Sequence, residues 1–254
     1  MLMKNNKNIF LYLILIFFSL IQGLVADEFD ISASNIKLLQ DSETIQAEGN
    51  VLIIGQDGII IESESATYDK KKNVIDAKKY VKITDRKTNN VLTSDKIQYL
   101  VNKEEIVAEG NVFFKDAKTN DELTSDKIQY LKNKEEIVAE GNVFFKGSEG
   151  VTIETEIALY DKRNQVIKSD QLTKMNDGYE NSILVDMFNY SIKNKNLRSQ
   201  GYIKITDKYE NKYFFDDIFI DVKNKRMAGS NLKLKFKKDT FGNIENDPRL
   251  VANS

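Results

Sequence analysis

A nearly identical internal repeat constrains this sequence more than any other feature. The segment LTSDKIQYL occurs at Leu92–Leu100 and again at Leu123–Leu131, an offset of 31 residues (123 − 92). The segment EEIVAEGNVFFK is copied at the same offset, at Glu104–Lys115 and Glu135–Lys146. Periods of 20–50 residues are typical of stacked-repeat proteins, in which each unit buries its apolar face against its neighbours. The sequence therefore predicts a stacked architecture.

The repeat extends over seven units, each marked by a small residue that we use as an anchor. Around the third anchor, the even offsets carry Ile106, Val112 and Phe114, and the even offsets of the other units are also mostly apolar, whereas the odd offsets are mixed. A period of two indicates strands with one buried face. The seven anchors, in steps of 29 to 31 residues, are Ala47, Ala77, Ala108, Ala139, Ser169, Ser199 and Ala228.

Each unit is predicted to hold two strands joined by a polar turn. The first strand carries the S-D-K-I-Q-Y-L segment, and the second runs from I-V-A into N-V-F-F. A glycine stands in the middle of the second strand in several units, and a glycine within a strand usually marks a bulge or a sharp bend. We therefore expect every rung of the stack to bend at the same corner, which gives the sheet an inside and an outside. These glycines are Gly49, Gly110, Gly141 and Gly201.

The sequence offers little for catalysis or metal binding. It contains neither His nor Cys, which removes the commonest general base, the usual nucleophile pairs and disulfides. Acidic residues such as Asp95 and Asp126 recur at one repeat position, so we interpret them as a solvated strand face or turn rather than as a catalytic pair. The net charge of −2 argues against a nucleic-acid partner. We expect a non-enzymatic protein without a cofactor or a metal.

A tyrosine recurs in five consecutive units. These residues could form a stacking platform for sugars or bases. We favour a cross-strand aromatic ladder that stabilises adjacent rungs. The five are Tyr68, Tyr99, Tyr130, Tyr160 and Tyr190.

The N-terminus is typical of an export signal. Lys4 and Lys7 precede a strongly apolar stretch, Ile9–Val25, and the small residue Ala26 precedes Asp27. We predict a signal peptide over residues 1–26, cleaved after Ala26. An uncleaved membrane anchor is the alternative, because the stretch is at the short edge of spanning length.

The repeated segments together resemble those of a known family of domains. A tyrosine strand, a polar turn, and A-E-G-N-V followed by apolar alternation are similar to the OstA/LptA-like lipopolysaccharide-transport domain family. The likeness is most literal at Ser94–Phe114 and Ser125–Phe145, and it is degenerate after Val151. Phe241–Asn243 and Asn246–Leu250 resemble the segment that leads from the periplasmic domain toward the barrel in the LptD family of lipopolysaccharide-assembly proteins. That family's paired cysteines are missing here.

The resemblance implies a fold and an organisation. The implied fold is all-β, a β-jellyroll or taco-like stack of about seven β-hairpin repeats, open at both edges. The implied organisation is a signal peptide (residues 1–26), an OstA/LptA-like domain (27–238) and a C-terminal connector (239–254) toward a barrel.

The resemblance also implies a function in the periplasm, in association with the outer membrane. Lipopolysaccharide would pass through as a ligand, with the acyl chains of lipid A held in the apolar interior. The implied partners are an LptA-like bridge protein, joined by edge-strand addition, and, in a full-length protein, an outer-membrane barrel with its lipoprotein partner. The expected partner edge consists of Ile31, Ala33, Ile36 and Leu38. The expected lipid-lining residues are Ile45, Val51, Ile53, Ile75, Val81, Ile83, Ile106, Ala108, Val112, Phe114, Ile137, Ala139, Val143, Phe145, Ile167, Ile203 and Ile205.

Three other interpretations remain open at the level of sequence. The chain could be a long soluble LptA-like protein, a membrane-anchored LptC-like subunit, or an exported structural or adhesive β-solenoid without a lipid role. A solenoid should have its core filled by bulky side chains, whereas a conduit needs small residues and a gap. The small anchors favour the conduit.

Overall fold

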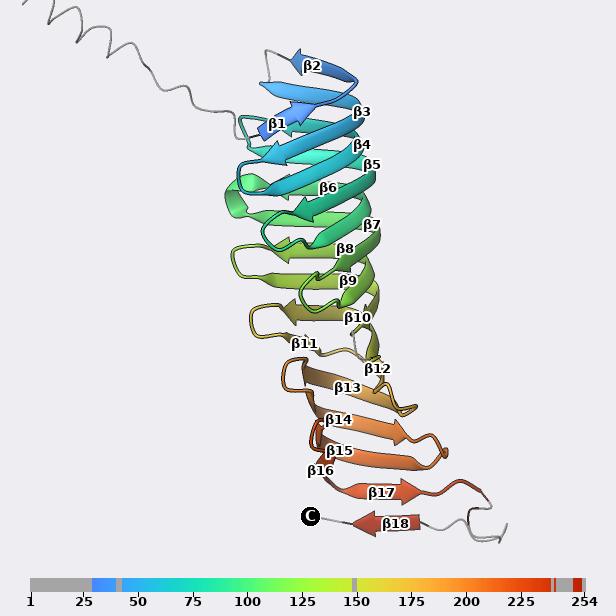
Figure 1. Cartoon of the computed structure of the whole chain (residues 1–254). Coiled ribbons are helices and arrows are strands. Elements are labelled where there is room, and N and C mark those ends of the chain that lie inside the picture. The colour runs from blue at the N-terminus through green and yellow to red at the C-terminus, as the bar shows by residue number, and fades with distance from the viewer. Residues whose placement is uncertain (1–28, 40–42, 148–149, 239, 241–248, 253–254) are drawn as a thin grey trace, which may run out of the picture.

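The computed structural model describes residues 29–39, 43–147, 150–238, 240 and 249–252. Apart from one 3-10 turn, η2 (Val101–Lys103), the described elements are all strands, and they form a single tall stack (Figure 1). The all-β prediction is confirmed. The strands are β1 (Phe29–Ser32), β2 (Asn35–Leu39), β3 (Thr44–Gly55), β4 (Ile59–Asp69), β5 (Val74–Asp85), β6 (Val91–Leu100), β7 (Glu105–Lys115), β8 (Glu122–Leu131), β9 (Glu136–Lys146), β10 (Thr152–Asp161), β11 (Val166–Ser169), β12 (Thr173–Asn176), β13 (Ser182–Ser191), β14 (Asn196–Thr206), β15 (Lys212–Asp221), β16 (Arg226–Ser230), β17 (Leu232–Lys235) and β18 (Arg249–Ala252).

The strands pair antiparallel in chain order, so each rung contacts the rung before it and the rung after it. The sequence repeat is also a repeat of register: Tyr99 faces Ile106 across β6 and β7, and Tyr130 faces Ile137 across β8 and β9. Some rungs are split. At the N-terminal end β1 and β2 share β3 as their neighbour, and β11 and β12 together form one rung. The predicted hairpin repeat is thereby confirmed.

The strands β3, β7, β9 and β14 bend near their middle at the glycines that the sequence singled out, whereas in β5 two other residues, Lys79 and Tyr80, are left-handed at the same place. The pairing of β7 with β8 shifts register between Glu109 and Val112, and the two residues between them are left-handed, Gly110 with φ +80° and Asn111 with φ +47°. Glycine adopts this conformation without steric penalty, and asparagine tolerates it better than most residues. The expected common corner is therefore present, and in β3, β7 and β9 a left-handed Gly-Asn pair turns the strand.

The recurring aspartates are part of this corner rather than a free charged face. Asp95 lies over Gly110, where an added Cβ would come 2.4 Å from Asp95 Oδ2. Asn111 Nδ2 donates a hydrogen bond of 2.8 Å to the same oxygen. Asp126 stands in the same relation to the next unit, over Gly141. The carboxylate is exposed, as predicted, but it also links the corners of two adjacent strands.

The anchor serines of the later units satisfy a backbone group that other residues satisfy in the earlier units. Ser94 Oγ donates a hydrogen bond of 3.0 Å to the carbonyl of Lys96, two residues further along its own strand. At the equivalent place β13 has Val185, which has no hydroxyl. There the anchor Ser199 on the neighbouring strand donates a bond of 2.7 Å to the Met187 carbonyl. The replacement of Ala by Ser at the anchor thus compensates for the loss of Ser at the bulge, as expected where an unpaired buried carbonyl is costly.

The bend divides the stack into two arms that face each other. We call the half of the strands that carries the recurring tyrosines the tyrosine arm, and the half that carries Phe114 and Phe145 the phenylalanine arm. Their inward side chains form one continuous apolar cluster along the stack. One assignment changes in the last unit: Gly229, not Ala228, pairs with Ile218 in register with Ser199, so Ala228 points to the outer face. In that unit the corner between the inward residues Gly229 and Leu232 is one residue shorter than the corner between Ala108 and Val112, so the repeat shifts by one position.

Candidate functional site

The interior between the arms is where the sequence placed the lipid-lining residues. Sixteen of the seventeen are buried, and Ile45, near the N-terminal edge, is half-buried. The buried ones are Val51, Ile53, Ile75, Val81, Ile83, Ile106, Ala108, Val112, Phe114, Ile137, Ala139, Val143, Phe145, Ile167, Ile203 and Ile205, all at most 8% exposed. The fold thus brings the predicted set together on one inward face.

The two arms touch across this interior. The ring of Phe114 lies 6.4 Å from that of Tyr130, and Phe145 lies 6.2 Å from Tyr160. The anchors Ala108 and Ala139 are at most 1% exposed. The room that the small anchors were expected to leave is therefore taken up by neighbouring side chains, and a guest could enter only if the arms moved apart.

The tyrosines do not form the direct ladder that the sequence suggested. In the pairing register Tyr99 stands between Ile75 and Ile106, so tyrosine and isoleucine alternate along the column. Their aromatic partners come instead from the opposite arm, as Phe114 does for Tyr130. All five are at most 8% exposed, so as they stand none offers a ring face to a sugar or a base. Burial, reinforced by the nearby acidic side chains, raises the pKa of Tyr130 to about 12.

The mouth between the arms, which we call the seam, is bridged by a contact centred on Asp57. Asp57 lies in the turn that ends the phenylalanine arm of β3. Lys132, from a turn of the tyrosine arm, places Nζ 2.6 Å from Asp57 Oδ2, and Tyr99 Oη donates a hydrogen bond of 2.5 Å to the same oxygen. Partial burial by itself would raise the pKa of Asp57, but hydrogen bonds from Lys132, Tyr99 and the Ile59 amide outweigh it and hold the pKa below 3.8.

A second contact bridges the seam further along the stack. Lys162 Nζ lies 3.2 Å from Asp116 Oδ2, and both side chains are at most 10% exposed. The same ammonium lies 5.3 Å from the ring centroid of Phe114 and 5.6 Å from that of Tyr130, one ring from each arm. A lysine thus covers the aromatic contact that closes the interior, and each of the two bridges joins the arms by a partly or largely buried ion pair.

The two ends of the stack differ from its middle. At the N-terminal edge Ile36 and Leu38 of β2 are 53% and 57% exposed, while Ile31 and Ala33 are half-buried against the core. At the other end Arg249–Ala252, inside the predicted connector, form β18 and pair with β17. Both ends carry exposed apolar side chains, and among the described residues no further rung pairs over them, which is the situation in which another strand can pair.

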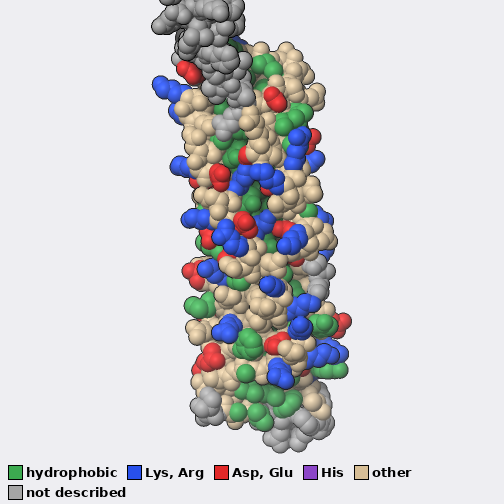
Figure 2. Space-filling model, turned by 60° about the vertical axis from the view of Figure 1, so that its left-hand side comes forward, with side chains coloured by type: hydrophobic (Ala, Val, Ile, Leu, Met, Phe, Trp, Pro, Cys, Tyr) green, Lys and Arg blue, Asp and Glu red, His purple; other side chains and the backbone are tan. Residues whose placement is uncertain are grey.

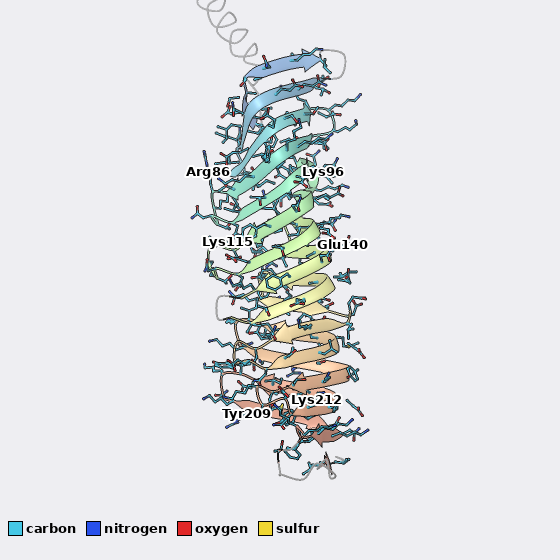
Figure 3. All side chains as sticks on the ribbon, turned by 90° about the vertical axis from the view of Figure 1, so that its right-hand side faces the viewer. Arg86, Lys96, Lys115, Glu140, Tyr209 and Lys212 are labelled. Atoms are coloured by element: carbon cyan, nitrogen blue, oxygen red, sulfur yellow. The ribbon has the colours of Figure 1, made fainter. Side chains whose placement is uncertain are left out.

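Charge is spread over the sides of the stack. Figure 2 shows basic and acidic side chains along the whole of one face, with neither sign confined to one end. In Figure 3 Lys96 and Glu140 lie on one side of the stack, and Lys115 and Arg86 on the other. Within the described ranges no three acidic residues are grouped so that they could hold a metal ion. In that same part of the chain no helix is long and apolar enough to cross a membrane.

Comparison with known proteins gives matches among solved structures. No family model and no curated protein matches the sequence. Among solved structures the chain is similar to LptH of Pseudomonas aeruginosa, described as the LptA homologous periplasmic component of a conserved lipopolysaccharide transport device. The match has 14% identity, covers 56% of this chain and 82% of LptH, and has a TM-score of 0.25. At that score the two backbones superimpose too loosely for the match to support a conclusion on function.

Proposed function

We propose that the chain is a non-catalytic carrier of lipopolysaccharide in the periplasm, holding acyl chains between its two arms. The observation that carries this proposal is the continuity of the apolar interior. One cluster of buried side chains extends without a break from Ile53 near the first rung to Ile205 in β14. The sequence resemblance to lipopolysaccharide-transport domains supports the same function.

Contacts with an acyl chain would offset much of the free energy that is lost when the two arms separate. Burying a methylene group gains about 0.8 kcal/mol, so an acyl chain between the arms would replace much of what the Phe114 and Tyr130 rings lose on parting. Parting separates the apolar side chains packed between the arms, the aromatic pairs among them, and breaks the two seam bridges, whereas the backbone hydrogen bonds run along the stack and stay intact. Opening along the seam therefore leaves the sheet whole.

The type of transport protein and its docking strand are assigned from the sequence resemblance and from the exposed strand at the N-terminal end of the stack. We assign the chain to the N-terminal part of an LptD-type assembly protein, exported by residues 1–26, which lie outside the described residues. The edge at β2 is the proposed docking strand for an LptA-like bridge protein, because Ile36 and Leu38 there extend the inward apolar row beyond the last covered rung. Head-to-tail pairing of this kind continues from one molecule to the next.

Photo-crosslinking at paired positions tests the proposal. A photoreactive amino acid replaces the buried Phe114 or Phe145, and in matched controls it replaces Phe113 or Phe144, their neighbours on the same strands, which face outward. In lipopolysaccharide-producing cells we expect glycolipid adducts at the two inward positions and few at the outward ones. Equal labelling at inward and outward positions, or none at the inward positions of a folded protein, would refute interior binding.

One observation favours a second function, that of a structural or adhesive β-solenoid. The interior is filled by side chains, which a permanently dry core also requires. A covalent link across the seam separates the two functions. The chain has no cysteine, so Asp57→Cys and Lys132→Cys can be joined by a short bis-maleimide. In a carrier the link should abolish the lipid adducts at Phe114, whereas a solenoid should give no adducts at Phe114 with or without the link.

A further inference from the structure

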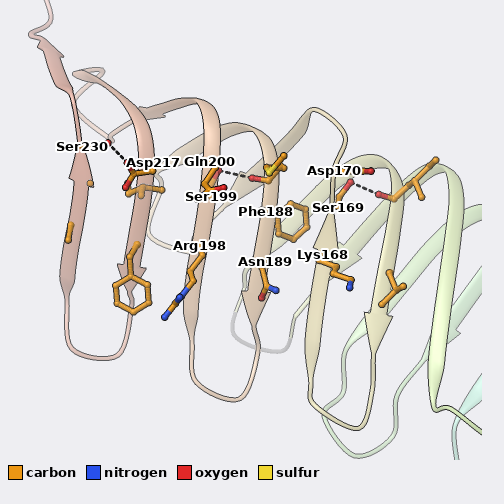
Figure 4. Close-up of a pocket in the computed structure, with 17 residues that line it drawn as sticks. Lys168, Ser169, Asp170, Phe188, Asn189, Arg198, Ser199, Gln200, Asp217 and Ser230 are labelled. Carbon is orange, nitrogen blue, oxygen red and sulfur yellow. Dashed lines mark hydrogen bonds between the residues drawn. The ribbon is translucent and has the colours of Figure 1, made fainter.

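A groove of about 1010 Å³ crosses the tyrosine arm from β10 to β16 (Figure 4). Its lining includes Ile157 and Leu159 but not Ala158 between them, which is 2% exposed and faces the core. Since successive side chains of a strand point to opposite faces, the groove lies on the outer face. It is therefore separated from the interior by the sheet itself. Its volume is at the upper end of the range of small-molecule sites.

The groove begins where a regular ladder of ion pairs ends. On the outer face of the preceding rungs Lys96 lies 2.6 Å from Glu109, and Lys127 lies 3.6 Å from Glu140. The next residue in this row, paired with Glu140, is Ile157. Ile157 is 42% exposed, and Met187 further along is 44% exposed. Two exposed apolar side chains thus take the place of charges that the earlier rungs pair.

A row of polar side chains forms one wall of the groove. Lys168, Asn189 and Arg198 are register partners on three adjacent strands, and all three are exposed. At about 4.8 Å per strand, the two cations are held roughly 10 Å apart with the amide between them. The Arg198 guanidinium lies 5.3 Å from the ring centroid of Phe219, which orients it along this wall (Figure 4). Among the ion pairs of the described residues, neither cation is joined to a carboxylate.

Two acids, Asp170 and Asp217, also line the groove, and both already have partners; by register Asp217 lies in the row of Met187 and Gln200. Gln171 Nε2 donates a hydrogen bond of 3.1 Å to Asp170 Oδ1, and Ser230 Oγ donates to Asp217 Oδ2. Both carboxylates are thus engaged by hydrogen bonds, whereas Lys168 and Arg198 in the neighbouring row are the cations that a ligand can reach. An elongated ligand with a single anionic end can satisfy the cationic wall while its apolar part lies over Ile157 and Met187.

We propose that this groove binds a single-chain anionic amphiphile. Its phosphate or carboxylate head lies against Lys168, Asn189 and Arg198, and its acyl chain packs on Ile157, Leu159 and Met187. The proposal follows from the charge of one wall and the apolar exposure beside it, and it does not depend on lipid entering the interior. The outer site and the interior site are then independent.

Calorimetric titration with dodecyl phosphate, below the concentration at which it forms micelles, tests the proposal. Loss of a charged hydrogen-bonding partner weakens binding by about tenfold or more, so we expect that decrease for Arg198→Gln and for Lys168→Gln. Ile157→Lys should also weaken binding, because it continues the ion-pair ladder into the groove. Lys204→Gln is the matched control, since Lys204 lies on the same strand as Arg198 but outside the groove.

Two further titrations identify the ligand class. Dodecyltrimethylammonium has the same chain with the opposite charge and should not bind, and inorganic phosphate should bind at least tenfold more weakly than dodecyl phosphate. Equal affinity of the Lys168→Gln/Arg198→Gln double variant and the wild type would overturn the proposal, as would phosphate binding as well as dodecyl phosphate. The seam-linked protein distinguishes the two sites, because the link should block interior binding and leave this groove unchanged.

Discussion

Lys132 Nζ lies 2.6 Å from Asp57 Oδ2, although the two residues are 75 positions apart in the chain. Neighbouring rungs are linked by backbone hydrogen bonds, whereas this ion pair links the two arms across the seam. The sheet and the closure of the interior are thus maintained by different sets of contacts. A change at the seam can therefore alter how readily the interior opens without disturbing the pairing of the strands.

The first prediction concerns this ion pair. Asp57→Asn should lower the free energy of unfolding at neutral pH by about 1 kcal/mol, because Lys132 and Tyr99 lose their charged acceptor. The folded-state pKa of Asp57 is lowered, so its stabilising effect is present above pH 3.8 and is lost as the pH falls through the folded-state value. The difference between wild type and variant in urea unfolding should therefore shrink below pH 3.8. A difference that stays constant down to the lowest pH would contradict this account.

The second prediction concerns Tyr130. Burial keeps the phenol neutral in the folded protein up to about pH 12, whereas in the unfolded chain it ionises near pH 10. Its stabilising effect is therefore present below pH 10 and is lost as the pH rises toward 12, by an amount on the order of 2 kcal/mol. Tyr130→Phe should reduce the steepness of alkaline unfolding, measured by circular dichroism. Tyr179→Phe, at an exposed position, is the control that should leave it unchanged.

The third prediction concerns the corner. Gly110→Ala should destabilise the protein by about 1–2 kcal/mol, since the residue is left-handed and the new Cβ would press on Asp95. Gly147→Ala is the matched control, because Gly147 does not have a positive φ and its added Cβ would meet no atom closer than 3.5 Å. Thermal unfolding should show a clear decrease in Tm for the first variant and almost none for the second. Similar Tm values for both would mean that the corner is not under conformational constraint.

The fourth prediction concerns the anchor serines. Ser199→Ala removes the donor to the Met187 carbonyl, a partly buried acceptor, and should cost about 1 kcal/mol. Val185→Ser gives up core packing and destabilises by itself, but it places a hydroxyl on the strand of the carbonyl, as Ser94 does for Lys96, so Ser199→Ala should cost less in its background than in the wild type. A double-mutant cycle in urea measures the coupling. Strict additivity would show that the two hydroxyls do not serve the same carbonyl.

The fifth prediction concerns the N-terminal edge. Ile36→Pro should abolish end-to-end docking of an LptA-like partner in a pull-down, because proline cannot take part in strand pairing as a donor. Lys37→Ala, on the same strand, keeps the backbone N–H and should bind normally. Interior crosslinking at Phe114 should persist in the proline variant, which reports that the rest of the stack is folded. Undiminished binding by the proline variant would exclude β2 as the docking strand.

The features that recur from unit to unit could be predicted from the sequence, whereas contacts that occur once could not. The period of two identified the inward face, and the glycine of each AEGN segment identified the bend, because both signals appear several times. Asp57 and Lys132 lie in turns of different units and carry no periodic signal, so their contact was not predicted. The outer groove does have a signal in the sequence, because the alternation of Lys and Glu that ends at Glu140 is followed by Ile157 in the same row.

The repeated register also determines how the molecule can change in length. Neighbouring strands are about 4.8 Å apart, so one 31-residue unit of two strands lengthens the protein by roughly 10 Å. Because Leu92–Lys115 and Leu123–Lys146 are nearly the same sequence, gene duplication can add such a unit while every new side chain meets a surface it already fits. The length of such a protein is thereby adjustable in whole steps, without redesign of its core.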